Sequence, residues 1–215
     1  MDVAASYERG IVSSTVYVPS HYGETTRQWP VEDRRGIYAM YTVIATEFSL
    51  FVCLFASYYY LGSNKNQWPI DEPPKMHLAL IMLGVLLTSS FVLHWGEKQV
   101  KRARHGAARI AISATSVIGL VFMVLQSFEY RDHWKTLTPF SDSYGSIFYT
   151  ITSFHAAHVL VGILLLGYVA ALPRYGPTVA PPYRPYRTVA LYWHFVDLVW
   201  IFIVVLLYIV PNMQV

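Results

Sequence analysis

The sequence is poor in the residues that soluble enzymes and nucleic-acid-binding proteins depend on. Of its 215 residues only 13% are charged, whereas soluble domains carry about 25%. Its single cysteine, Cys53, excludes an internal disulfide and any zinc or iron–sulfur site built from cysteines. It contains no glycine-rich phosphate loop, HExxH helix or nucleophile elbow. The first residues lack the basic and apolar regions of a signal peptide, so none is expected.

Long apolar runs are what the chain has in abundance, and 54% of its residues are hydrophobic. Five runs without Lys or Arg cover about 37–61, 77–95, 110–128, 146–172 and 188–210. Each is long enough to cross about 30 Å of hydrocarbon as a helix. None shows the alternation of a membrane β-barrel. We therefore predict an all-α integral membrane bundle of five transmembrane helices, with a polar N-terminal surface segment (1–36), a membrane domain (37–210) and a short tail (211–215).

The basic residues predict how the bundle is oriented. Twelve of the 16 Lys and Arg residues fall in the N-terminal segment and in the second and fourth connections, and the other four fall in the first and third connections. Positively charged segments stay on the cytoplasmic side of the membrane. We therefore expect a cytoplasmic N-terminus and a C-terminus on the outside.

A few ionisable residues lie inside the predicted spans, where a charge at the bilayer centre costs about 3 kcal/mol. Glu47 and Asp197 are the carboxylates well inside a span, and His155 and His158 share one face of the fourth helix. At about 1.5 Å per residue, all four reach similar depths near the midplane. A Glu47–His155 pair or an Asp197–His158 pair is therefore allowed, and the sequence does not decide between them.

Several roles for these polar residues remain open at this point. Glu47, His155, His158 and Asp197 could form a metal site, although no Glu-x-x-His pattern is present. His94 and His194 lie near one face and could hold a haem. A proton path needs titratable groups that reach water, and only a midplane cluster is evident. Polar packing inside the bundle is the favoured interpretation.

Two smaller features belong to the same spans. Close helix packing is expected at Gly84, Gly119, Gly162 and Gly167. Cys53 is expected to be a small apolar packing residue. The basic run 98–109 marks topology and could also bind anionic headgroups.

Five sequence segments resemble subunit III of haem–copper terminal oxidases, the cytochrome c and quinol oxidases. YWHFVDLVWIF (192–202) resembles the closing motif of that family, and YGSIFYTITSFHAAHVLVG (144–162) resembles the preceding signature. LQSFEY (125–130), SSFVLHW (89–95) and ATEFSLFVCLFASYY (45–59) match the earlier helices. The resemblance covers roughly residues 28–210 in the family's order, and the chain is similar to the short five-helix bacterial form.

The resemblance implies a non-catalytic subunit of a proton-pumping oxidase. Haem and copper are then expected in partner subunits and none in this chain, whose status as an enzyme by itself is left open. The family's membrane carboxylate, which carboxyl reagents modify and which supports proton uptake, falls on Glu47. The implied partners are subunit I, subunit II, a small subunit IV, phospholipids and a respiratory supercomplex, without nucleic acid. Headgroup contacts are expected at His94, Trp95, Arg102 and His194.

The branch of the family stays open. Cytochrome c is the expected electron donor, and a quinol oxidase subunit or the accessory subunit of a nitric oxide reductase are the alternatives. The expected location is the bacterial cytoplasmic (inner) membrane. An autonomous transporter with the same polar cluster is disfavoured, because the five spans show no inverted repeat. A haem-bearing cytochrome b-like subunit is the other rival.

Overall fold

The structure, a computed structural model, describes residues 35–63, 68, 76–102, 104–134, 137–140, 142–171 and 183–213. These residues form α1 (Arg35–Ser63), α2 (Met76–Lys101), α3 (His105–His133), α4 (Ser143–Ala171) and α5 (Tyr183–Ile203), followed by a π-helical turn η1 (Val204–Ile209) and a short α6 (Val210–Met213). Within this part of the chain five helices are long and apolar enough to cross a membrane, and there is no strand. The five-helix prediction is confirmed. Nearly all of the predicted N-terminal segment 1–36 lies outside the described residues.

The helices are longer than the apolar runs that predicted them. α3 and α4 have 29 residues each, about 43 Å at 1.5 Å per residue, which exceeds the hydrocarbon core by more than 10 Å. α2 ends at Lys101 and α3 begins at His105, so most of the expected connection 96–109 is helical. Likewise α3 continues through His133. The extra turns carry charged and polar residues, because helix ends reach the headgroup region, where such residues are tolerated.

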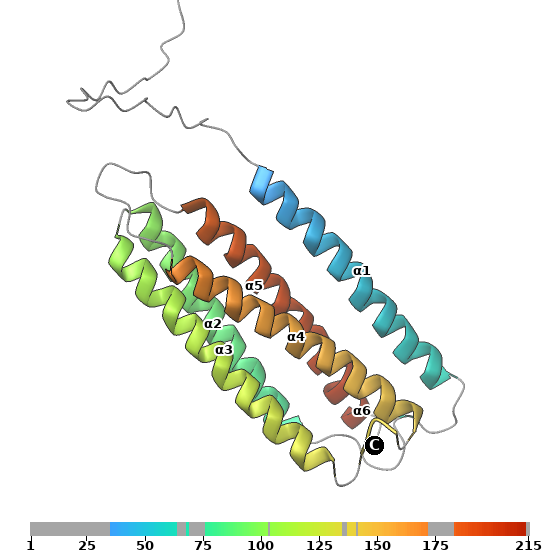
Figure 1. The fold of residues 1–215 in the computed structure, drawn as a ribbon. Helices are drawn as coiled ribbons and strands as arrows, with labels where there is room; N and C mark the ends of the chain where they lie inside the picture. The colour runs from blue at the N-terminus through green and yellow to red at the C-terminus, as the bar shows by residue number, and fades with distance from the viewer. Residues whose placement is uncertain are drawn as a thin grey trace, which may run out of the picture. The chain divides into compact units, whose positions relative to one another are not determined.

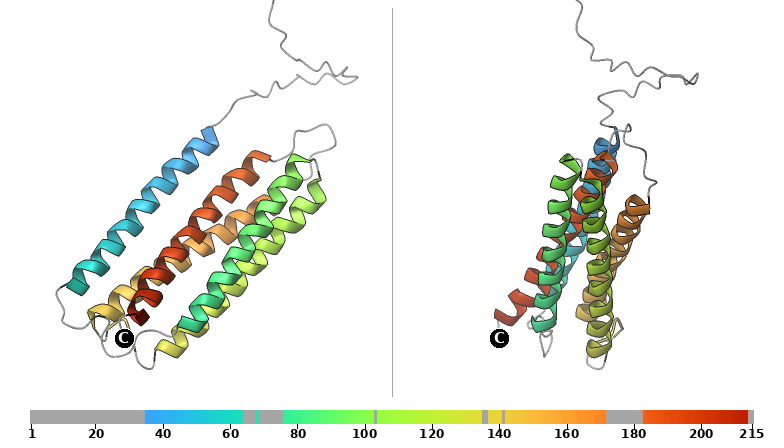
Figure 2. Two further views of the ribbon diagram at one scale, coloured as in Figure 1. Left: turned by 180° about the vertical axis from the view of Figure 1, so that it is seen from behind. Right: turned by 90° about the vertical axis from the view of Figure 1, so that its left-hand side faces the viewer.

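Consecutive helices run in opposite directions, and α5 holds the bundle together (Figure 1). α5 packs against α1, α2 and α4, and α3 packs against α2 and α4. The two views of Figure 2 show α2 and α3 side by side, with α1 on the far side of α4 and α5. The last span is the most buried of the five and α1 is the least. Most side chains of α1 are therefore not buried against the other helices of this chain.

The Trp193 side chain of α5 packs closely against α3 and α4. It is fully buried, and its indole lies against Gly119 of α3 and Gly162 of α4. A Cβ atom at Gly119 would lie 2.7 Å from the indole, and one at Gly162 would lie 2.8 Å from it. The packing role predicted for these two glycines is confirmed. It was wrong for Gly84 and Gly167, where an added Cβ would meet nothing within 4 Å, because both face outward from the bundle.

The C-terminal end of the last span departs from a regular α-helix. Pro211 has no backbone N–H, and η1 precedes it, with the Val210 N–H bonded to the Val205 carbonyl. The Asn212 side chain donates to the Tyr208 carbonyl at 2.8 Å. The predicted tail 211–215 is therefore helical as far as Met213. Tyr208 lies in this wider turn and is fully buried.

Candidate functional site

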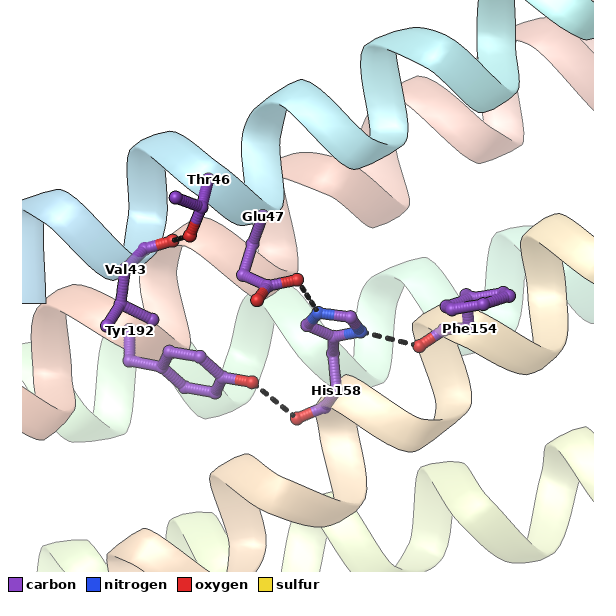
Figure 3. Close-up of polar contacts among 6 residues, drawn as sticks. All are labelled: Val43, Thr46, Glu47, Phe154, His158 and Tyr192. Carbon is purple, nitrogen blue, oxygen red and sulfur yellow. Dashed lines mark hydrogen bonds and ion pairs between the residues drawn. The ribbon is translucent and has the colours of Figure 1, made fainter.

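Glu47 of α1 and His158 of α4 form an ion pair or hydrogen bond across the bundle (Figure 3). The Glu47 Oε2 atom lies 3.0 Å from His158 Nε2, and the other ring nitrogen, Nδ1, lies 2.7 Å from the Phe154 carbonyl. A carbonyl oxygen only accepts, so Nδ1 must carry a proton. One further proton is then shared between Nε2 and Oε2. The pair is either imidazolium with carboxylate or neutral imidazole with carboxylic acid.

The surroundings hold the His158 ring in place. The Phe51 ring meets it edge-on, with centroids 5.1 Å apart. The Tyr192 hydroxyl donates to the His158 carbonyl at 3.4 Å. The side chains of His158 and Glu47 keep 13% and 32% of their surface exposed, so the pair lies at the edge of the bundle. Both side chains are therefore accessible to groups outside this chain.

Asp197 of α5 belongs to a second polar site, on the α2 side of α5. The Ser90 hydroxyl makes a short hydrogen bond to Asp197 Oδ2, and the Ser90 Oγ atom lies 2.8 Å from His194 Nδ1. Next to it, the Trp193 indole N–H donates to Ser89 Oγ at 2.8 Å. Two consecutive serines of α2 therefore contact two different faces of α5. The Asp197 side chain is almost fully buried.

His155 lies apart from both sites. Its ring is stacked on Trp200 with centroids 4.8 Å apart and meets the Phe122 ring edge-on. The side chain is fully buried, and in the described part of the chain neither ring nitrogen has a hydrogen-bond partner. His155 is therefore surrounded by aromatic rings and is part of the core.

The single midplane cluster predicted from the sequence is therefore wrong in its geometry. Glu47 pairs with His158 and not with His155, and Asp197 bonds to Ser90 and not to His158. Residues three apart on one helix share a broad face, but here α1 and α5 contact different parts of it. Among the described residues no group of three or more His, Cys, Asp and Glu side chains could hold a metal ion. The four residues do not combine into the metal site considered above.

Glu129 is a polar residue that the sequence argument missed. It is fully buried, and its two carboxyl oxygens accept from the Tyr208 hydroxyl at 2.7 Å and from the Gln126 amide at 3.1 Å. The predicted third span ended at residue 128, so Glu129 counted as part of a connection. Gln126, Glu129 and His133 follow Phe122 at helical spacing. Continuing the helical phase beyond the apolar run could have found it.

The residues expected to contact lipid headgroups gather near the C-terminal end of α2. His94, Trp95 and Arg102 are exposed there, whereas His194 is partly buried against Ser90. Arg109 has a structural role, since its guanidinium donates to the Ala170 carbonyl at 2.8 Å, near the end of α4. Cys53 lies exposed on α1, so it does not pack inside this chain. The lipid contacts stay a prediction.

Comparison with known proteins decides the family. A family model described as "Cytochrome c oxidase subunit III" matches residues 27–211. The chain belongs to the cytochrome c oxidase subunit III family. A cytochrome c oxidase subunit 3 of Thermostichus vulcanus is 33% identical over 171 residues, covering 79% of this chain and 84% of the relative. One of Synechocystis sp. is 31% identical over 168 residues, covering 77% and 71%. A "probable cytochrome c oxidase subunit 3" of Mycobacterium tuberculosis is 32% identical over 171 residues, covering 77% and 83%.

Membership in the subunit III family confirms the resemblance that the five sequence segments indicated. A subunit III belongs to an oxidase complex with other subunits, and the five apolar helices make this one a multi-pass membrane protein. All of the segments that carried the resemblance lie within the matched range. In the structure they form the parts of α1 to α5 that hold Glu47, His158, Asp197 and Glu129.

Proposed function

We propose that this subunit III is a non-catalytic part of a proton-pumping haem–copper terminal oxidase in a bacterial cytoplasmic membrane. The family membership over residues 27–211 carries the proposal. The haem and copper would lie in partner subunits. In this chain the polar side chains inside the spans are occupied by one another, as with Glu47 and His158, or by aromatic rings, as with His155.

The main partner in this proposal is the catalytic subunit I, with subunit II and a small subunit IV further away. A row of large apolar and aromatic side chains on α1 supports a partner on that side. Exposed along it are Tyr38, Tyr41, Phe48, Val52, Tyr59 and Tyr60. Phospholipid would cover the rest, with its headgroups at His94, Trp95, Arg102 and His194. Association into a respiratory supercomplex is part of the same proposal.

The Glu47–His158 pair would support proton uptake by the complex. It holds one mobile proton between Nε2 and Oε2, and it lies at the edge of the bundle with both side chains partly exposed. A carboxyl–imidazole pair that shares a proton can give it to, or take it from, a neighbouring group without leaving an unpaired charge behind. The pair suits a subunit that keeps protons available to its partner.

Purification through a tag on this chain, in a mild detergent, tests the proposal. We expect haem bands in a reduced-minus-oxidised spectrum and oxygen consumption that cyanide blocks. Turnover with reduced cytochrome c assigns the expected branch, and turnover only with quinol assigns a quinol oxidase. Reduction of nitric oxide in place of oxygen assigns the accessory subunit of a nitric oxide reductase. A chain that purifies alone, colourless and inert would contradict the proposal.

A further inference from the structure

A line of polar side chains follows α2 from its C-terminal end to the middle of the span. Ser90, His94, Glu97 and Lys101 are spaced by four, three and four residues, so they share one face of the helix. At 1.5 Å per residue, Ser90 lies about 16 Å from Lys101 along the helix axis. Glu97 and Lys101 belong to the charged last turns of α2, which the headgroup region tolerates. Ser90 and His94 lie within the apolar run, where polar side chains are costly in lipid and point to a function.

α5 continues this line inward. His194 and Asp197 both contact Ser90, as described above. His94 and Glu97 lie within electrostatic range of the His194 ring, and Glu97 pairs with Lys101 at 3.2 Å. We call these six residues of α2 and α5 the polar seam. It connects the charged end of α2 with a buried carboxyl group.

The directions of the hydrogen bonds give the seam an order. A serine hydroxyl has one proton and donates it to one acceptor. Because the Ser90 hydroxyl donates to Asp197 Oδ2, its oxygen accepts from His194, whose Nδ1 must then carry a proton. The order is His194, Ser90, Asp197. This differs from a hydrolase triad, where histidine lies between serine and the acid, so the arrangement does not activate Ser90 as a nucleophile.

We propose that the polar seam is a proton-exchange path between Asp197 and the aqueous surface at the Lys101 end of α2. A proton arriving from that end binds His194 Nε2. The Nδ1 proton then passes to Ser90 Oγ as the Ser90 proton passes to Asp197 Oδ2. Asp197 has gained one proton, and neutral His194 is left with its proton on Nε2 instead of Nδ1.

Asp197 is not bonded as a purely structural carboxyl group would be. Its Oδ1 atom is buried and, within the described part of the chain, has no hydrogen-bond partner, whereas buried polar atoms that serve packing are nearly always paired. Glu129 provides the contrast, since both of its oxygens accept a hydrogen bond. An unpaired oxygen next to an ordered donor chain fits a group whose protonation changes.

Among the described residues, no ionisable side chain of the neighbouring helices forms a hydrogen bond directly with Asp197. From α1, Glu47 is paired with His158 of α4, and from α4, His155 is stacked on Trp200. The polar seam therefore shares no residue with the Glu47–His158 pair, and a substitution can disrupt one of them without the other. Besides Asp197, the ionisable groups of the polar seam are His94, Glu97 and Lys101 from α2 and His194 from α5.

Infrared spectroscopy of the complex purified through this chain tests the path. The carboxyl C=O band that disappears in Asp197→Asn identifies protonated Asp197, and its shift on replacing H₂O by D₂O reports proton exchange. We expect rapid exchange in the wild type and exchange at least about tenfold slower in Ser90→Ala, where the link between His194 and Asp197 is gone. Ser90→Thr keeps the hydroxyl and should restore the rate.

Ser89→Ala is the matched control, because it removes the neighbouring hydroxyl, which contacts Trp193 and not the polar seam. It should leave the exchange of the Asp197 band unchanged, and Ser90→Ala should leave any Glu47 band unchanged. If Ser90→Ala does not assemble, His194→Phe breaks the same chain one step further out. Equal exchange rates in wild type and path variants would overturn the proposal. So would the absence of any Asp197 band across the pH range in which histidine and carboxyl groups titrate.

Discussion

At the scale of single residues, three carboxyl groups in the described spans each lie beside a specific partner. Glu47 faces His158, Asp197 faces Ser90, and Glu129 faces Tyr208 and Gln126. An unpaired charge or polar group in this environment costs several kcal/mol, so each partner has a stabilising role whatever else it does. Variants must therefore be chosen to separate proton chemistry from stability.

Glu47→Gln separates the two for the Glu47–His158 pair. The glutamine amide can still donate to His158 Nε2, so we expect the complex to assemble, but the amide cannot give up a proton. Sustained oxygen consumption should fall at least about fivefold, the low end of typical coupling between sites. Thr46→Val is the control, since the Thr46 hydroxyl bonds to the Val43 carbonyl of its own helix, at 2.7 Å (Figure 3). Loss of assembly in Glu47→Gln would count against this account.

Tyr208→Phe tests the buried Glu129 site. The change removes the hydroxyl that donates to Glu129 at 2.7 Å and leaves a buried carboxyl oxygen without its donor. We expect a loss of stability of about 1–3 kcal/mol, measured as a lower unfolding temperature of the purified complex in detergent. Tyr168→Phe, at an exposed position on α4, should change it little. An equal effect of both substitutions would show that the Glu129 contact contributes nothing specific.

At the scale of the elements, small residues decide how closely the helices approach. Trp193 fills the space that Gly119 and Gly162 leave open between α3, α4 and α5. Gly96 of α2 has the same role towards Tyr186, whose hydroxyl also donates to the Leu93 carbonyl at 3.0 Å. In lipid, where apolar burial adds little between helices, such close contacts carry much of the association.

Alanine at Gly119 or Gly162 should therefore destabilise the bundle. The added methyl group would overlap the Trp193 indole, and overpacking of this kind costs about 1–3 kcal/mol. Gly84→Ala and Gly167→Ala are matched controls in α2 and α4, with nothing within 4 Å of the added atom. Thermal unfolding of the purified subunit in detergent should separate the two pairs. If all four variants unfold at the same temperature, the close packing of Gly119 and Gly162 against Trp193 does not stabilise the bundle.

Helix existence was predictable from the sequence, but helix ends and helix faces were not. The apolar runs predicted all five spans because each long run must satisfy its backbone hydrogen bonds internally in lipid. The ends at Lys101 and His133 were missed because charged turns continue the same helix into the headgroup region. That Glu47 lies level with the middle of α4 was predictable from residue counts, whereas its partner there depended on how α1 and α4 are rotated about their axes.

At the scale of the whole molecule, the distribution of basic residues predicts the orientation. Lys98, Lys101, Arg102, Arg104 and Arg109 gather at the end where α2 meets α3. Positively charged connections remain cytoplasmic, so this end should face the cytoplasm, as should the N-terminus. The proton-exchange path proposed above would then open on the cytoplasmic side.

Cysteine labelling measures this orientation directly. In a Cys53→Ser background, we expect Phe140→Cys, at a highly exposed position before α4, to react with a membrane-impermeant maleimide in intact cells. Gly106→Cys, exposed at the start of α3, should react only after the membrane is opened. The reverse pattern would invert the predicted topology.

The sequence by itself determined the membrane class, the number of spans and the family. These follow from composition, run length and local motifs, which do not depend on how the helices are arranged. Only the tertiary structure decided that Glu47 meets His158, that Ser90 joins His194 to Asp197, and that Glu129 is buried beneath Tyr208. Each of these contacts joins helices far apart in the sequence, and which side chains meet depends on the rotation and closeness of packing that Trp193 and its glycines impose.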